Sequence, residues 1–209
     1  MPQLRPIALD FEQAAEELSE FRTFLEENTS FSETQVVKEL RTRPHLSCLI
    51  GSLIAGVSRA NVYKFEFQIQ GVFRADLVVG NLQQKRFVLV EFEGGETHSI
   101  FGPGQTNQMR NWSRQLEHGL GQLVDWAWAL QDASHTQILK NNFGCEDIST
   151  VFLLVCGRDG LMDPTEQKRF FWRSNNILLS GTRATCLTYD GLLLFFETTI
   201  EAIRSYRAG

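Results

Sequence analysis

The sequence predicts an α/β protein in which a mixed β-sheet is flanked by helices. Two short runs rich in β-branched and aromatic residues, 73–79 and 86–93, are joined by polar turn residues, the signal for adjacent antiparallel strands. A near-continuous apolar run at 149–156 suits a central strand buried on both faces. Segments whose apolar residues recur at helical spacing lie before, between and after these strands.

The N-terminal part is expected to form a helical arm over residues 1–45, followed by one domain over residues 46–209. Asp10 is placed to cap a first helix. Ser32 gives the same start signal for a second helix, which Pro44 should end because proline cannot continue a helix.

The middle of the chain carries a further strand and the longest helix. Strict alternation of apolar and polar residues indicates a half-buried antiparallel strand, with one face made by Tyr63, Phe65, Phe67 and Ile69. A loop at 94–105, marked by glycines and a proline, precedes a helix at about 107–131. Gly119 and Gly121 each cost this helix about 1 kcal/mol relative to alanine. A helix retains such residues where something packs closely, so we expect it to lie against the sheet.

The C-terminal part is predicted to add a helix, a strand and a closing helix. Pro164 suits the first turn of a helix that Asp163 caps. A short strand is expected at 184–189 and an apolar helix at 191–206. No internal repeat, low-complexity segment or linker divides the sequence.

Composition indicates an intracellular globular protein. The chain has 209 residues, 43% of them hydrophobic, and no apolar run approaches the ~20 residues that cross a bilayer. The N-terminus has no apolar signal core, and the four scattered cysteines favour reduced thiols in a cytoplasm over a zinc site or disulfides. Because the net charge is −5, contact with nucleic acid must come from a local patch.

Three carboxylates are expected to gather at one end of the predicted strand pair. Side chains alternate along a strand, so Glu91 and Glu93 share a face, and antiparallel pairing brings Asp76 beside them. Carboxylates this close raise one another's pKa, and a divalent cation such as Mg²⁺ or Mn²⁺ relieves the repulsion. The alternative is that each acid is solvated on an exposed sheet face.

Two further polar residues are candidates for the same site. Gln122 lies beside the apolar stripe of the long helix and is expected to point toward the carboxylates; the alternative is a surface amide. Glu66, on the polar face of its strand, is a candidate fourth acid, although a solvated strand residue is the commoner case.

Several ordered motifs resemble one family. An Asp on one strand, Glu-x-Lys on the next and a Gln on the following helix form the PD-(D/E)XK nuclease pattern. More specifically, the chain resembles the Shedu antiphage nuclease domain in its Glu-x-Glu variant, over about residues 20–194. The motifs that carry the resemblance are the helix Glu20 to Asn28, Val90-Glu91-Phe92-Glu93, Ile100-Phe101, Gly104, the helix Leu116 to Trp126, Gly157-Arg158 and Thr188-Tyr189-Asp190-Gly191-Leu192.

This resemblance implies a restriction-endonuclease-like core, a divalent metal and DNA cleavage in defence against phage. Asp76 and Glu91 would hold Mg²⁺ or Mn²⁺, and Glu93 would add a ligand or orient water as a base. Gln122 would donate to a phosphate oxygen or position water. The cations available to position phosphate are Lys85 and Arg86 and, as predicted DNA contacts, Arg110, Arg114 and Arg158.

The chain also departs from the family pattern. Glu93 stands where lysine is usual, so a second interpretation is a catalytically degenerate nuclease fold that binds DNA or a partner protein. A third, weakly favoured by the acidic charge, is a structural or toxin-neutralising protein. Shedu proteins usually carry a sensing region before the nuclease, whereas residues 1–19 precede the match here. We therefore expect regulation to come from elsewhere or from assembly into a homo-oligomer. The expected partner of the protein is phage or other foreign DNA, and no membrane association is expected.

Overall fold

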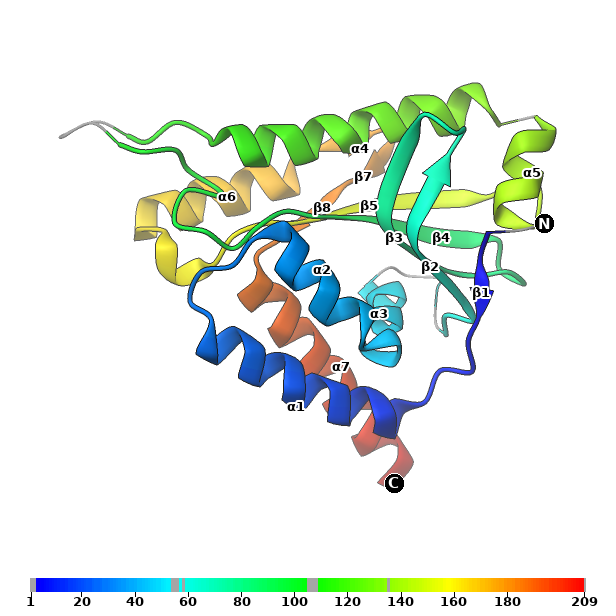
Figure 1. Ribbon diagram of the computed structural model, residues 1–209, viewed down its shortest axis with the longest axis horizontal. Helices are drawn as coiled ribbons and strands as arrows, with labels where there is room; N and C mark the ends of the chain where they lie inside the picture. The colour runs from blue at the N-terminus through cyan, green and yellow to red at the C-terminus, as the bar shows by residue number, and fades with distance from the viewer. Residues whose placement is uncertain (1–2, 54–56, 58, 105–108, 135, 209) are drawn as a thin grey trace.

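Helices cover both faces of one mixed sheet, which confirms the predicted α/β class (Figure 1). The structure is a computed structural model that describes residues 3–53, 57, 59–104, 109–134 and 136–208. Its elements are β1 (Arg5–Pro6), α1 (Phe11–Glu27), α2 (Glu33–Arg41), α3 (Pro44–Leu49), the 3₁₀ helix η1 (Ile50–Leu53), β2 (Val62–Ile69), β3 (Phe73–Asn81), β4 (Arg86–Phe92), α4 (Arg114–Asp132), α5 (Gln137–Phe143), β5 (Ser149–Val155), the 3₁₀ helix η2 (Asp159–Leu161), α6 (Pro164–Asn175), β6 (Leu178–Leu179), β7 (Thr182–Arg183), β8 (Thr185–Leu187) and α7 (Tyr189–Ala208).

The main sheet has the strand order β1-β2-β3-β4-β5-β8. The strands from β1 to β4 pair antiparallel, and β3 and β4 are the predicted pair, with Leu77 opposite Val90. The buried apolar run forms β5, which lies parallel to β4 and to β8. The strand that carries Glu91 is therefore central and paired on both sides.

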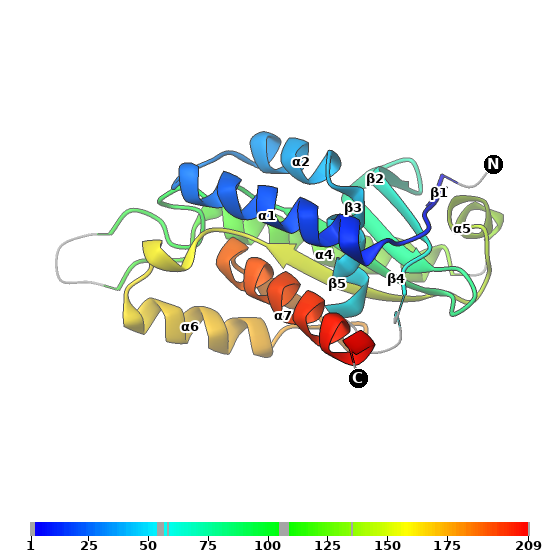
Figure 2. The ribbon, with the colours of Figure 1, turned by 90° about the horizontal axis from the view of Figure 1, so that it is seen from below.

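Each face of the sheet has its own hydrophobic core. Helices α1, α2, α3 and α7 pack on one face, where α1 and α7 lie side by side (Figure 2). Helices α4, α5 and α6 contribute to the core on the other face. Among the described residues, no helix is long and apolar enough to cross a membrane.

The sequence signals for the N-terminal helices are confirmed. The Asp10 carboxylate caps α1, and Ser32 and Gln35 form a reciprocal capping box on α2. Helix α2 ends at Arg41, before Pro44, as predicted. Pro44 itself opens α3, a short helix that was not expected, because proline at a first helical position lacks only a donor that would be unpaired there.

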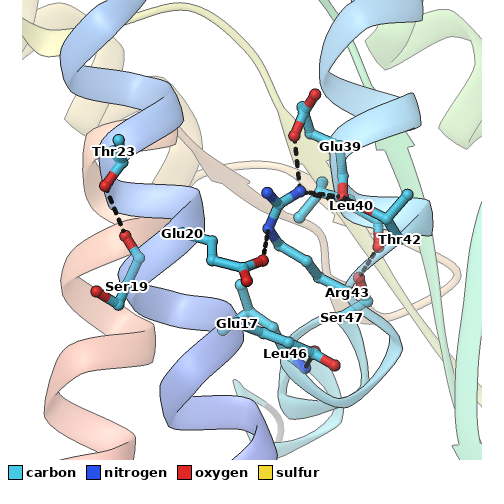
Figure 3. A network of polar contacts seen from close by, with 10 residues as sticks. All are labelled: Glu17, Ser19, Glu20, Thr23, Glu39, Leu40, Thr42, Arg43, Leu46 and Ser47. Carbon is cyan, nitrogen blue, oxygen red and sulfur yellow. Dashed lines mark hydrogen bonds and ion pairs between the residues drawn. The ribbon is translucent and has the colours of Figure 1, made fainter.

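A polar network joins these first three helices (Figure 3). The Arg43 guanidinium lies 2.7 Å from the Glu39 carboxylate of α2 and 3.3 Å from that of Glu20 in α1. Buried Glu17 of α1 accepts a 2.7 Å hydrogen bond from the backbone N–H of Leu46 in α3. The network fixes α2 against α1, and so fixes where α2 begins relative to the sheet. The domain boundary after residue 45 stays a prediction.

Strand β2 does not keep the simple alternation that the sequence predicts. Phe65 packs in the core with α1, whereas Phe67 and Ile69 pack in the core with α4. Between them Glu66 has a φ of 53°. In the paired strand β3, the side chains before and after Asp76, which lies opposite Glu66, also pack on different faces of the sheet. The hairpin therefore turns over at Glu66 and Asp76, and its outer half curls toward α4 (Figure 1).

The long helix begins later than the sequence predicts. Ser113 is its N-cap and accepts a hydrogen bond from the Leu116 N–H, so α4 starts at Arg114. The segment before it is extended because Trp112 bridges to Phe101 and their rings stack at 4.5 Å. The predicted start at residue 107 lies outside the described residues. Strand β1, helix α5 and the β6–β7 pair were not expected, and the closing helix starts at Tyr189 rather than 191.

Helix α4 lies close against the sheet at one of its two glycines. A Cβ atom added to Gly119 would come within 2.6 Å of Leu154 Cδ1 and 3.1 Å of Glu93 Cγ, whereas one added to Gly121 would meet nothing within 4 Å. The expected close approach is thus confirmed at Gly119 alone.

We predict opposite effects of alanine at these two positions. Gly119→Ala should lower the free energy of unfolding by about 1–3 kcal/mol because the methyl group overpacks the helix–sheet contact. Gly121→Ala, the matched control, should raise it by up to about 1 kcal/mol because it only improves helix propensity. Thermal unfolding followed by circular dichroism measures both, and equal shifts would contradict the close packing of α4.

Candidate metal centre

Glu91 and Glu93 lie on the α4 face of the sheet at the end of β4. Their neighbours Val90 and Phe92 point into the opposite core, so the predicted alternation is confirmed. Both glutamates are only 3% exposed. Two carboxyl groups are thus buried side by side between β4 and α4.

Asp76 is fixed at the end of the β3–β4 ladder. Backbone pairing ends at Leu77 and Val90, and beyond it Asp76 Oδ2 accepts a 2.8 Å hydrogen bond from the Phe92 N–H. A side chain thus takes over the role of a backbone carbonyl. Burial raises the pKa of Asp76 to about 6, against the lowering effect of this bond, and the Glu33 and Glu93 charges add to the increase.

One carboxyl oxygen of Glu91 accepts a hydrogen bond, and the other has no hydrogen-bond partner among the described residues. Gln122 Nε2 donates to Glu91 Oε1, which confirms the predicted placement of that amide. Glu91 Oε2 is buried without a hydrogen-bond partner among the described residues. Burial, followed by the charges of Asp76 and Glu93, raises the pKa of Glu91 to about 10. The charged form of Glu91 therefore requires a cation or a hydrogen-bond donor at Oε2, and no described protein group supplies one.

Glu93 faces a histidine on α4. His118 Nδ1 lies 3.0 Å from Glu93 Oε1, within hydrogen-bond distance, and the His118 side chain is 66% exposed. Burial raises the pKa of Glu93, and the contact with His118 opposes that increase. One ligand atom from each of Glu91, Glu93 and His118 lies within 4.8 Å of the others. The site thus reaches from a buried carboxyl pair to a solvent-exposed imidazole.

His118 was not among the candidates from the sequence. It sits four residues before Gln122, so the two share a helix face, and this spacing is the signal that could have found it. Gln115, one turn earlier, lies close enough to Glu93 for its side-chain amide to lower the pKa of Glu93. Glu33, at the start of α2, raises the pKa of Asp76, Glu91 and Glu93 by its negative charge. No local pattern predicts Glu33, because its position depends on how α2 packs.

The residues present fit a divalent cation. Carboxylate oxygens are the ligands of Mg²⁺ and Mn²⁺, and an imidazole suits the transition metals. The unpaired Oε2 of Glu91 and the mutual repulsion of the acids are what a bound cation would relieve. The charge of Asp76 raises the pKa of Glu91, but Asp76 is outside the set whose ligand atoms lie within 4.8 Å of one another.

Two of the three arginines predicted to contact DNA are engaged in ion pairs. Arg110 binds Glu166 through two nitrogens and lies over the Phe101 ring. Arg158 binds the Asp190 carboxylate at 3.0 Å and the backbone carbonyls of Leu25 and Asn28 at the end of α1. Arg114 is exposed and makes no ion pair within the described part of the chain. Of the three, Arg114 is the one with a guanidinium not already engaged.

The remaining charged candidates lie outside the carboxyl cluster. Arg86 begins β4, about 17 Å from Glu91 along the strand, and Lys85 lies in the turn before it. Glu66 is exposed and faces Arg41 and Arg74 at 3.4 and 3.7 Å, so it is not part of the buried cluster.

A separate cavity of about 430 Å³ lies between α6, β8 and the start of α7. Apolar and neutral polar side chains make up most of its wall, including Phe170, Cys186 and Thr188. The carboxyl cluster, and not this cavity, therefore defines the candidate site.

Fold and site together define an α/β protein whose mixed sheet is compatible with a nuclease-like core and which carries a candidate carboxylate–histidine metal site. The family model for the Shedu protein SduA, C-terminal, matches residues 14–193. Because the match covers most of the chain, the protein belongs to this family. A comparison with curated proteins gives no match.

We predict that Glu91 makes the metal-free protein less stable as the pH rises. Its pKa is about 10 in the folded protein and 4.5 ordinarily. Between pH 4.5 and 10 the unfolded chain has lost this proton while the folded protein still holds it, so the free energy of unfolding falls as the pH rises. Glu91→Gln removes this penalty. In chelator, its Tm should exceed that of the parent by a few degrees at pH 8 and by progressively less toward pH 5.

Exposed Glu26 on α1 provides the control for this comparison. Glu26→Gln should show no such trend between pH 5 and 8. A difference between Glu91→Gln and the parent that stays constant over the same range would contradict the burial of an uncompensated Glu91 carboxyl.

Proposed function

We propose that this protein is a metal-dependent deoxyribonuclease that hydrolyses phosphodiester bonds of phage or other foreign DNA. The observation that carries the proposal is the buried Glu91 carboxyl, with an unpaired oxygen, beside Asp76, Glu93 and His118. Membership of the Shedu family supports the same chemistry, because the motifs of the chain resemble an antiphage nuclease.

Each side chain has a proposed role. Asp76 and Glu91 would hold a Mg²⁺ or Mn²⁺ ion, with Glu93 or His118 as a further ligand. Such an ion, when bound, neutralises charge on a phosphate and lowers the pKa of water. Gln122 keeps Glu91 oriented through the bond to Oε1, which leaves Oε2 for the ion. A carboxyl whose pKa is raised by burial, as that of Glu93 is, suits acceptance of a proton from an attacking water.

A second function is favoured by one observation. Glu93 occupies the position where the family pattern usually has lysine, so no ammonium group at that position stabilises developing phosphate charge. On this alternative the chain is a degenerate nuclease fold that binds DNA or a protein without cleaving. Incubation of plasmid and linear DNA with Mg²⁺, with Mn²⁺ and with chelator distinguishes the two, since only the enzyme gives metal-dependent products.

We predict that the carboxyl cluster binds Mn²⁺. Calorimetric titration should show saturable binding to the parent, and the double variant Asp76→Asn, Glu91→Gln should lose it because two anionic ligands become neutral. Glu66→Gln is the matched control, since Glu66 is an acid on a neighbouring strand outside the cluster. Equal Mn²⁺ affinity in the parent and the double variant would exclude these residues as ligands.

We also predict that the carboxylate of Glu93 is required for cleavage. Glu93→Gln keeps the shape and removes the charge, so single-turnover cleavage at fixed Mg²⁺ should fall by about 10²-fold or more. Glu93→Lys restores the commoner motif but adds a positive charge, which opposes the ion and should lower Mn²⁺ affinity. If Glu93→Lys cleaves DNA while the parent does not, the enzyme proposal fails and the binding module replaces it.

A further inference from the structure

One face of α6 lines the cavity of about 430 Å³ that lies between this helix, β8 and the start of α7. The lining residues of α6 follow the spacing of three and four positions that places side chains on one side of a helix: Gln167, Phe170, Phe171, Ser174 and Asn175. The volume is in the range of small-molecule sites, about 300–1,000 Å³. The cavity is therefore large enough for a ligand with a ring and a polar group.

The wall combines an aromatic ring with the open edge of a strand. Phe171 lines the cavity and is nevertheless 72% exposed, so much of its ring is free for contact with a ligand. Across from α6 lies β8, the last strand of the main sheet, which pairs with β5 alone among the described strands. An edge strand offers backbone N–H and C=O groups that no other strand uses. A ring to stack on and nearby donors and acceptors are what the recognition of an unpaired base requires.

Charges of opposite sign lie at the two ends of the cavity. Gln167 Nε2 donates to the Asp159 carbonyl at 3.3 Å, which places Asp159 at the start of the α6 face. Arg183 donates to the Asn175 side-chain oxygen at 3.2 Å, which places Arg183 at the other end. The two ends are eight positions apart, or about 12 Å along the helix. A matching ligand has an anionic group at Arg183 and hydrogen-bond donors at Asp159.

Arg183 has the capacity to hold this anion. Its side chain is exposed, and within the described part of the chain it makes no ion pair with a carboxylate. The bond to Asn175 occupies only one of the N–H donors of the guanidinium. The remaining donors form a planar fork, whose geometry matches phosphate. Phosphate is therefore the anion that suits this end of the cavity.

We propose that this cavity binds a mononucleotide, with the base stacked on Phe171, the N–H groups of the base directed to Asp159 and the phosphate on Arg183. The phosphate and the base are at opposite ends of such a molecule, as Arg183 and Asp159 are in the cavity. An aromatic amino acid does not match, because its two charges lie on one carbon atom. The site is separate from the carboxyl cluster, so the inference goes beyond the proposed nuclease function and does not depend on it.

Calorimetric titration of the whole protein with dGMP in chelator tests the proposal, because chelator prevents binding through a metal ion. The parent should bind dGMP, and should bind deoxyguanosine about 10- to 150-fold more weakly because the charged contact with phosphate is missing. Arg183→Gln should lower the affinity for dGMP by a similar factor and leave that for deoxyguanosine unchanged. Arg5→Gln is the control, since Arg5 is exposed on β1 at the opposite edge of the sheet.

The base contacts are tested in the same titrations. Phe171→Ala should weaken dGMP and deoxyguanosine alike, by about 5- to 150-fold, the range for one stacked base. Phe171→Tyr should restore most of the affinity because it keeps an aromatic face. Asp159→Asn should also weaken both ligands, because an amide has one acceptor oxygen where the carboxylate has two. Trp172→Ala should bind like the parent, since Trp172 is exposed on α6 but does not line the cavity.

The proposal is overturned if the parent does not bind dGMP, or if Phe171→Ala or Arg183→Gln binds dGMP as the parent does. It is also overturned if the double variant Asp76→Asn, Glu91→Gln loses dGMP, because the nucleotide would then bind at the carboxyl cluster. These failures are distinct from failure of the nuclease proposal, which rests on metal-dependent cleavage of DNA and is unaffected by any result obtained with dGMP in chelator.

Discussion

The burial of like-charged carboxyl groups between β4 and α4 is the constraint on which the rest of the structure depends. Glu91 and Glu93 are almost inaccessible to solvent, and burial and mutual repulsion raise the pKa of Glu91 far above its ordinary value. A fold keeps such a cluster only if stronger packing compensates for it. Here the compensation comes from a central strand that is paired on both sides and covered by a core on each face.

The neighbouring elements are shaped around this cluster. Gly119 lets α4 approach β4 so closely that His118 and Gln122 reach the carboxyl oxygens. The hairpin turns over at Glu66 and Asp76, which ends the backbone ladder where the Asp76 side chain binds the Phe92 N–H. The same turn carries the hairpin tip to α4, where Gln70 fixes it. One distortion thus positions both the Asp76 carboxyl and the hairpin tip.

The arginines divide between architecture and exposed surface. Arg158 joins the end of α1 to the start of α7, and Arg110 joins the segment before α4 to α6. Their charges are therefore neutralised within the fold. Arg74 and Arg114 remain exposed, and under the proposed function this acidic protein would depend on such exposed cations to contact DNA.

The sequence by itself determined the elements whose signals are local. The β3–β4 pair, the caps Asp10, Ser32 and Asp163, the shared face of Glu91 and Glu93 and the inward side of Gln122 follow from alternation, helical spacing and capping chemistry. The tertiary structure alone decided what depends on distant segments. Glu33 comes near the acids only through the packing of α2, Trp112 delays α4 by pairing with Phe101, and Arg158 is held by α1 and Asp190. Local patterns fix dihedral angles and faces, but contacts between residues tens of positions apart are set by packing of the whole chain, which no short window of sequence contains.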